Sequence, residues 1–226
     1  MSTYGWVLLC TIAGPFALSF DKKIHFYTRF RPLFIAILPV SSFFLLWDAY
    51  FTDNHIWGFT EEHIAKIYLY NLPVEEVLFF FLVPYSCVFI YEVLIGYFPK
   101  LNLSVFSTYF SYLFIALGTT LILTGIGNWY TISACTISCL LVAYTGLLKQ
   151  KKWFPYFSLT FTIALIPFII VNGVLTGAIT ENPIVWYSEN HIVGIRLITI
   201  PIEDLFYNAS LLLPIIWIYE KIKQVA

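Results

Sequence analysis

Charged residues are scarce in this chain of 226 residues, where they make up 11%, against about 25% in an average soluble domain. So little charge cannot cover a surface that faces water, which excludes an ordinary soluble domain. The net charge of −1 excludes a nucleic-acid binder with a strongly basic face, and the hydrophobic share of 60% excludes a disordered chain. The composition therefore indicates a polytopic membrane protein.

Motifs that hold common cofactors are also missing. The sequence has no strand followed by GxGxxG, no GxxxxGK[ST] and no DxxxD. Its four histidines are too few for a membrane di-iron oxygenase and show no HxxH or HExxH spacing, and the last apolar run has no lysine for a retinal Schiff base. The four cysteines lie in apolar runs, where we expect packing roles. We therefore expect no cofactor and no metal site.

What the chain does have is seven continuous apolar runs long enough to cross roughly 30 Å of hydrocarbon. They cover residues 4–20, 33–51, 72–95, 108–124, 129–148, 158–178 and 198–219. Their continuity favours helices over the alternating strands of a barrel. We therefore expect an all-α fold with about seven transmembrane helices.

The basic residues between these runs predict the orientation. Ten of the twelve fall on one side of the membrane: Lys22, Lys23, Arg29, Arg31, Lys100, Lys149, Lys151, Lys152, Lys221 and Lys223. An excess of lysine and arginine marks the cytoplasmic side. The prediction is an N-terminus outside and a C-terminus in the cytoplasm.

The sequence also matches itself at a fixed shift of 128 positions. Over the 58 positions from residue 35 to residue 92 there are 16 identities without a gap, and they include matched Pro, Glu, His and Asn. The shift carries spans one to three onto spans five to seven, an even number of spans apart. We therefore expect a parallel 3+1+3 repeat about an axis along the membrane normal, with halves at residues 1–97 and 129–226 and a linker helix within 98–128.

Each half places two acids just after a proline and just before an apolar run. The first half reads Leu-Pro-Val-Glu-Glu and the second Ile-Pro-Ile-Glu-Asp, so the candidate residues are Pro73, Glu75, Glu76, Pro201, Glu203 and Asp204. Acids in hydrocarbon cost about 2.5–3.5 kcal/mol each on insertion scales and usually mark function. The alternative is a purely structural role, in which these residues only cap two helices at the membrane interface.

The identity of Glu75 and Glu203 across the repeat favours them as the central pair, flanked by Glu76 and Asp204. Two close carboxyls in low dielectric cannot both ionise cheaply, so we expect a neutral acid beside a carboxylate, able to give and take a proton. Further polar groups that can support such a site are Asp48, His63, Asn172 and His191. The histidines, with Glu61 and Glu189, are also the one plausible metal cluster, although structural roles are favoured for them.

The duplicated Pro-x-Glu-[Glu/Asp] motif in this helix plan resembles the integral-membrane lycopene cyclases, whose two halves are separate chains in some bacteria and fused in archaea, other bacteria and fungi. The resemblance covers essentially the whole chain. It assigns the catalytic role to Glu75, Glu76, Glu203 and Asp204, and the structural motif to Pro73 and Pro201. The second acid of the second half is Asp, whose side chain has a shorter reach than that of Glu.

The resemblance implies an isomerase, or intramolecular lyase, of carotenoid biosynthesis in a bacterial or archaeal cell (inner) membrane. Protonation of an acyclic end of lycopene gives a cation, ring closure follows, and proton loss yields a cyclic alkene, most commonly a β-ionone ring. The partners implied are lycopene or a related acyclic carotenoid, membrane lipid and other enzymes of the carotenoid pathway, with no nucleic acid. Some of the 45 aromatic residues (22 Phe, 16 Tyr and 7 Trp) can stabilise the cation.

Two other readings stay open at the level of sequence. A small proton-coupled transporter of 3+1+3 architecture also uses intramembrane acids, but it needs a polar path, and the spans offer few matched Asn, Gln or Ser. A carotenoid-binding or assembly protein without catalysis would have the same composition. Pigment analysis in a lycopene-accumulating cell separates the three.

Overall fold

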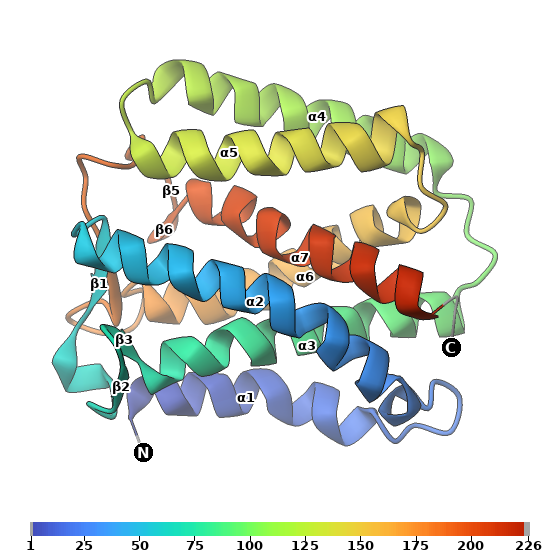
Figure 1. Ribbon diagram of the computed structural model, residues 1–226, viewed down its shortest axis with the longest axis horizontal. Helices are drawn as coiled ribbons and strands as arrows, with labels where there is room; N and C mark the ends of the chain where they lie inside the picture. Colours follow the sequence, from blue (N-terminus) through green and yellow to red (C-terminus); the bar gives the residue numbers. More distant parts are fainter. Residues whose placement is uncertain (1, 224–226) are drawn as a thin grey trace.

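Long apolar runs form helices in the computed structural model, which describes residues 2–223. Across this range seven α-helices lie side by side (Figure 1): α1 (Thr3–Leu18), α2 (Phe30–Asp53), α3 (Val74–Tyr97), α4 (Ser104–Thr124), α5 (Trp129–Val142), α6 (Phe154–Leu175) and α7 (Glu203–Lys223). A 3-10 turn, η1 (Phe26–Arg29), precedes α2, and a π-helical stretch, η3 (Ala143–Leu148), continues α5. The all-α class expected from the composition is confirmed.

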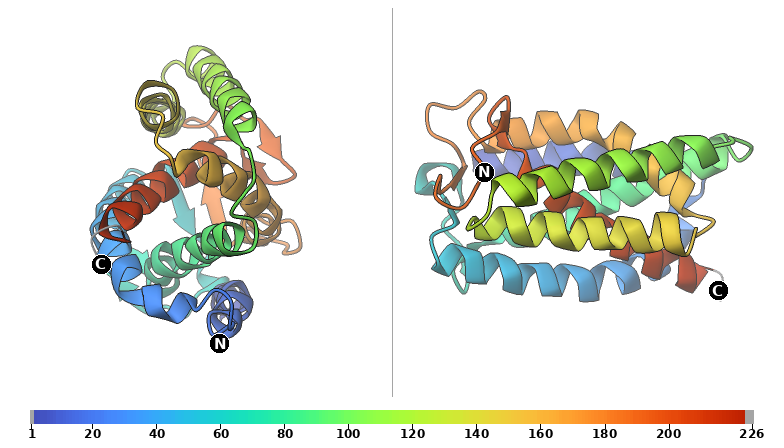
Figure 2. Two further views of the ribbon diagram at one scale, coloured as in Figure 1. Left: turned by 90° about the vertical axis from the view of Figure 1, so that its right-hand side faces the viewer. Right: turned by 90° about the horizontal axis from the view of Figure 1, so that it is seen from above.

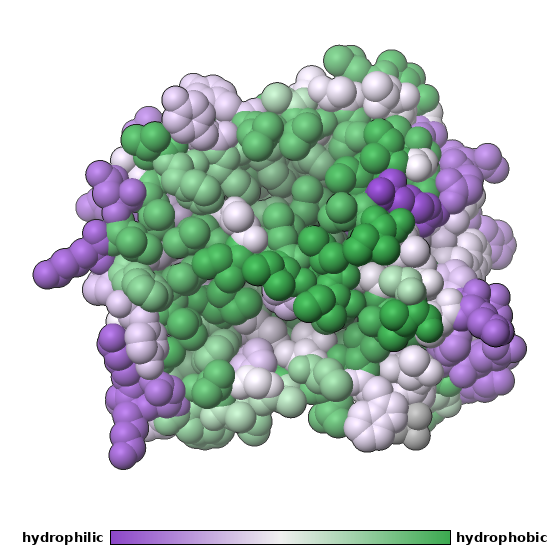
Figure 3. Space-filling view, turned by 180° about the vertical axis from the view of Figure 1, so that it is seen from behind, coloured by the Kyte–Doolittle hydropathy of each residue, from purple (hydrophilic) through white to green (hydrophobic). Residues whose placement is uncertain are grey.

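Five of these helical segments are long and apolar enough to cross a membrane, namely the segments 26–53, 74–97, 104–124, 129–148 and 154–175. Helix α1 is also apolar but has 16 residues, and α7 carries acids in its first turn and lysines in its last. Figure 3 shows a broad hydrophobic band between two hydrophilic ends of the bundle. The bundle thus has the surface of a membrane protein, and a count of seven crossings stays a prediction.

Helices α3 and α7 lie in the middle of the bundle and carry the paired acids. Helix α1 packs on α3 and α5 packs on α7, while α2 packs on α7 and α6 packs on α3. Helix α4 lies at the periphery against α5 and α6 (Figure 2). The first residues of α3 and α7 are therefore surrounded by helices from both halves of the chain.

Six short strands, which the sequence did not predict, gather at the end of the bundle that holds the N-terminus (Figure 1). Strand β1 (Trp57–Phe59) pairs antiparallel with β4 (Val185–Tyr187), and in this register Gly58 lies opposite Trp186. Two hairpins lead into the central helices: β2 (Tyr68–Leu69) with β3 (Leu72–Pro73), and β5 (Arg196–Leu197) with β6 (Ile200–Pro201). A 3-10 turn, η2 (Glu61–His63), lies between β1 and β2.

At the opposite end, two tyrosine–glutamate hydrogen bonds link α3 and α7. Tyr91 donates to Glu220 at 3.0 Å, and Tyr219 donates to Glu92 at 2.9 Å. Lys223 lies 2.5 Å from the Glu92 carboxylate and 3.6 Å from that of Glu220. The two central helices are therefore joined by polar contacts far from the paired acids.

Candidate active site

The two hairpins give the paired acids the same local geometry in both halves. Pro73 and Pro201 end strands β3 and β6, one residue before α3 and two residues before α7. The Val74 amide donates to the Ile67 carbonyl at 2.8 Å, and the Ile202 amide donates to the Ile195 carbonyl at 3.0 Å. A proline fits here because it presets φ and needs no helical hydrogen bond. Each hairpin thereby delivers its acids into the first turn of a central helix.

Glu75 and Glu203 bind the loops of their own halves. One oxygen of Glu75 accepts from the Ala65 amide at 2.7 Å and from the Ser2 hydroxyl. One oxygen of Glu203 accepts from the Val193 amide at 2.7 Å and from the Thr131 hydroxyl at 2.6 Å. Neither residue lines the central cavity, so the central pair that repeat identity favoured does not form.

The central pair is instead Glu76 and Asp204. Both are buried and line a cavity of about 60 Å³ between the two halves. The Tyr4 hydroxyl donates to Glu76 Oε2 at 2.6 Å, and the Tyr130 hydroxyl donates to Asp204 Oδ1 at 2.6 Å. Neighbouring side chains on a helix point about 100° apart, so the two acids of each pair face different surroundings. One acid of each pair binds a loop amide, and the next faces the cavity.

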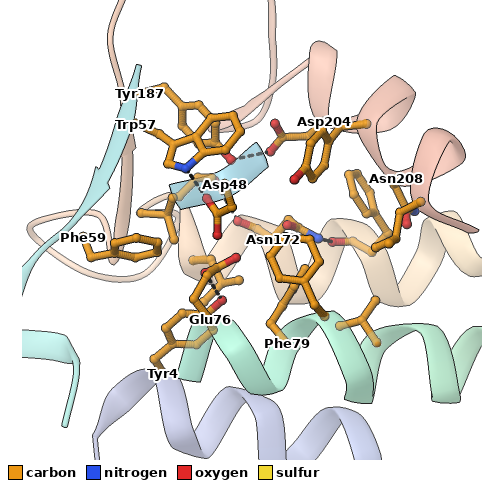
Figure 4. Close-up of a pocket in the computed structure, with 18 of the residues that line it drawn as sticks. Tyr4, Asp48, Trp57, Phe59, Glu76, Phe79, Asn172, Tyr187, Asp204 and Asn208 are labelled. Atoms are coloured by element: carbon orange, nitrogen blue, oxygen red, sulfur yellow. Dashed lines mark hydrogen bonds between the residues drawn. The ribbon is translucent and has the colours of Figure 1, made fainter. Parts of the chain in front are cut away.

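Asp48 supplies a third carboxyl to the same cavity. It comes from the buried face of α2, and its Oδ1 accepts a hydrogen bond from the indole N–H of Trp57. Within residues 2–223, its Oδ2 atom has no hydrogen-bond partner. Figure 4 shows Asp48, Glu76 and Asp204 directed into the space between Trp57 and Asn172. Three acids with different hydrogen-bond partners therefore share one enclosed site.

Tyr187 completes the hydrogen bonding of Asp204. Its hydroxyl donates to Asp204 Oδ2 at 2.9 Å, so both oxygens of this carboxyl accept from a tyrosine. Burial and the adjacent Asp204 carboxylate raise the pKa of Tyr187 well above its ordinary value near 10. Tyr187 therefore keeps its proton and acts as a donor at any physiological pH.

Aromatic rings form much of the remaining wall. Trp57 lies against Tyr130, Tyr207 and Tyr187 with ring centroids 5.0, 5.8 and 6.1 Å apart, and Phe79 and Phe80 line the same cavity. Faces of such rings attract cations, most strongly where water is excluded. The cavity thus combines groups that can exchange protons with walls that tolerate a positive charge.

The remaining sequence candidates divide into two groups. Asn172, like Asp48, lines the cavity. His63 and His191 lie outside it: His63 faces Thr3 at 3.4 Å, and Glu61 and Glu189 form ion pairs with Lys66 and Arg196. Among residues 2–223, no three His, Cys, Asp or Glu side chains come together as a metal site. The two glutamates are exposed, and the two histidines are partly buried in the loops away from the cavity.

The sequence analysis missed several polar residues that line the cavity, among them Tyr4, Tyr130, Tyr187 and Asn208. A signal for two of them was present, since Tyr4 and Tyr130 occupy the same place in α1 and α5 and bind equivalent acids. They are 126 positions apart, so a gapless comparison at a shift of 128 does not align them with each other. Tyr187 matches Phe59 at that shift and offered no such signal.

Comparisons with known proteins add an independent observation. A family model described as "Lycopene cyclase" matches residues 1–94 and 127–222 and leaves out the segment that holds α4. The chain is also similar to the "Bifunctional lycopene cyclase/phytoene synthase" of Phaeosphaeria nodorum, with 31% identity over 65 residues. That match covers 29% of this chain and 11% of the fungal protein, so it spans a small part of a much longer relative. No solved structure matches the chain.

Proposed function

The chain belongs to the lycopene cyclase family, and we propose that it closes the acyclic ends of lycopene, or of a related acyclic carotenoid, by proton-initiated cyclisation. The observation that carries the proposal is the cavity itself, where three carboxyls meet aromatic walls between the two central helices. The product has the same atoms as the substrate, so the enzyme is an isomerase, formally an intramolecular lyase. We further propose that the ring is of the β type.

The reaction needs one proton donor and one acceptor. A carboxylic acid protonates the terminal double bond of the acyclic end, which leaves a tertiary cation. A neighbouring double bond of the same molecule attacks that cation and forms the ring bond, and the positive charge moves onto the ring. Loss of a ring proton to a carboxylate gives the cyclic alkene, so protons and electrons balance without a redox partner.

Hydrogen-bond partners suggest which carboxyl does which step. Asp204 accepts from two tyrosines, and hydrogen bonds to a carboxylate favour its charged form. Glu76 accepts from Tyr4 alone, so its other oxygen is available to carry a proton. We therefore propose Glu76 as the acid and Asp204 as the base. Asp48 supports them as a neighbouring carboxyl, and Glu75 and Glu203 position the helices.

We also propose that the chain is an internal repeat. The shift of 128 relates β1 to β4, hairpin β2–β3 to hairpin β5–β6, and Tyr91–Glu220 to Tyr219–Glu92, which supports the 3+1+3 repeat. The halves would be residues 1–97 and 129–226, joined through a linker at 98–128. Membrane lipid and other enzymes of the carotenoid pathway are the partners proposed, in a bacterial or archaeal membrane.

Expression in a lycopene-accumulating bacterium tests the function. Chromatography of the pigments should show a cyclised carotenoid when the wild-type protein is detected in the membrane fraction. The Glu76→Gln variant at the same membrane level is the matched control and should leave lycopene unchanged. Unchanged lycopene with abundant wild-type protein would refute the proposal, whereas a ring of another type would correct only the β assignment.

A further inference from the structure

A second hollow begins at the surface of the bundle between α1 and α6. It has a volume of about 350 Å³, and α3 forms its floor with Val83, Ser86, Cys87 and Ile90. Exposed residues on its rim are Cys10 and Gly14 of α1 and Pro167 and Ile170 of α6. The rim lies in the part of the bundle expected to meet hydrocarbon, so the groove opens toward lipid.

This groove adjoins the cavity that holds the acids. Val83, Phe168, Asn172 and Asn208 line both hollows. In Figure 4, Asn172 and Asn208 lie on the side of the cavity away from Trp57 and Phe59. An elongated apolar molecule lying in the groove would therefore have one end directed at Glu76 and Asp204.

The related positions in the other half of the chain hold aromatic side chains. The shift of 128 puts Phe44 where Asn172 stands and Phe80 where Asn208 stands. Both rings are buried, with 3% and 1% of their surface exposed, and Phe44 packs on Tyr207 with centroids 5.1 Å apart. The position related to the junction of groove and cavity is thus filled by aromatic side chains.

We propose that the carotenoid enters through the groove between α1 and α6, and that the groove holds the unreacted polyene arm during the reaction. In this arrangement one end of the carotenoid reaches the acids at a time. The proposal rests on the proposed function. With one entrance, a carotenoid that is cyclised at both ends leaves after the first ring and returns with its other end leading. A one-ring product is therefore released as a free intermediate.

Gly14 allows the groove to be closed without disturbing the core. A Cβ added at this position meets no atom within 4 Å, so a larger residue can start here without a clash and extend over the groove mouth. Gly14→Trp should lower cyclisation about tenfold or more, because the arm is displaced from its path to the acids. Gly14→Ala should change it little. Leu140→Trp, on the exposed face of α5, is the matched control and should retain wild-type activity.

The thiol of Cys10 reports occupancy independently of catalysis. Cys10 is exposed on the rim, whereas Cys87 and Cys135 are buried. In liposomes, added acyclic carotenoid should suppress alkylation of Cys10 by a membrane-permeable maleimide, as measured by mass spectrometry. The thiol introduced by Leu140→Cys should react at the same rate with and without carotenoid.

The outcomes separate this proposal from the proposed function. Wild-type cyclisation with full activity in Gly14→Trp and no protection of Cys10 would overturn the groove and leave the cyclase intact. A second contrary outcome is slow alkylation of Cys10 in phospholipid liposomes that does not change when carotenoid is added. It would assign the groove to a lipid tail and also overturn the proposal. Carotenoid protection of Cys10 without any cyclisation by the wild type would support the groove and refute the enzyme.

Discussion

At the scale of single residues, the loop-binding and the inward-facing acids differ by one position along each helix. Glu76 and Asp204 face the cavity, while Glu75 and Glu203 bind backbone amides of their own loops. The motif therefore combines two roles, binding a loop and facing the cavity, which a sequence comparison does not separate. Substitutions at adjacent positions should consequently fail in different ways.

Replacing the inward carboxyls with amides should abolish the proton transfers and leave the fold. Glu76→Gln keeps the size of the side chain and an oxygen that accepts from Tyr4. Asp204→Asn keeps the size and one of the two oxygens that accept from Tyr130 and Tyr187. Cyclisation should fall by about 10²-fold or more, the usual contribution of a positioned acid or base. Pigment yield per amount of membrane protein is the measurement, and Glu61→Gln, in the exposed pair with Lys66, should retain activity. Near-normal yield from both variants would move the chemistry elsewhere.

Removing a loop-binding acid should instead weaken the fold. Glu203→Ala deletes the acceptor for the part-buried Val193 amide and the buried Thr131 hydroxyl. The free energy of unfolding should drop by about 1–3 kcal/mol for each donor left without an acceptor. Thermal unfolding in detergent measures this, with Glu76→Gln as the comparison because it keeps the acceptor for Tyr4. A stable but inactive Glu203→Ala protein would give this residue a chemical role instead.

At the scale of elements, the sequence predicted the helices well and the strands not at all. Apolar runs bounded by basic or polar segments place α2 to α6 within a few residues, because burial in hydrocarbon leaves the helix as the simplest way to satisfy the backbone. Strands β1 and β4 have three residues each and pair across 126 to 130 positions, so no local periodicity marks them. The same holds for Tyr187, which β4 brings to Asp204.

The pairing of β1 with β4 places the small Gly58 opposite the large Trp186, and we expect stability to depend on this match in size. A side chain added at Gly58 would lie 2.4 Å from the Trp186 ring, so Gly58→Ala should destabilise by about 1–3 kcal/mol through overpacking. Because the register is symmetric, the double variant Gly58→Trp with Trp186→Gly should recover much of that stability. Thermal unfolding of the single and double variants in detergent is the measurement. The symmetric register would be refuted if the double variant lost more free energy of unfolding than the two single variants lose together.

At the scale of the whole molecule, we expect the distribution of basic residues to set the orientation. Seven alternating helices would place the loops at 19–25, 98–103 and 149–153 at one end, with half of the twelve lysines and arginines. Reporters fused after Lys23, Lys100, Lys151 and Ala226 should read cytoplasmic. Reporters near Asn54, Asn128 and Asn182 should read external, and an external C-terminus would contradict both the seven crossings and the parallel repeat.

A proton-only reaction also predicts the behaviour of the purified protein. Protein in liposomes should cyclise lycopene without added flavin, nicotinamide or metal, and a chelator should leave the rate unchanged. Loss of activity on chelation, with recovery on adding one divalent metal, would contradict the acid–base scheme. His63, His191, Glu61 and Glu189 would then be the residues to substitute first.

The contact between Gly58 and Trp186 also makes the two strands differ in shape. A homodimer built from one half would place identical residues on both sides of its axis, either two tryptophans that collide or two glycines that leave a void. In this chain the tryptophan fills the space beside the glycine. Two identical copies of either half could therefore not reproduce this contact.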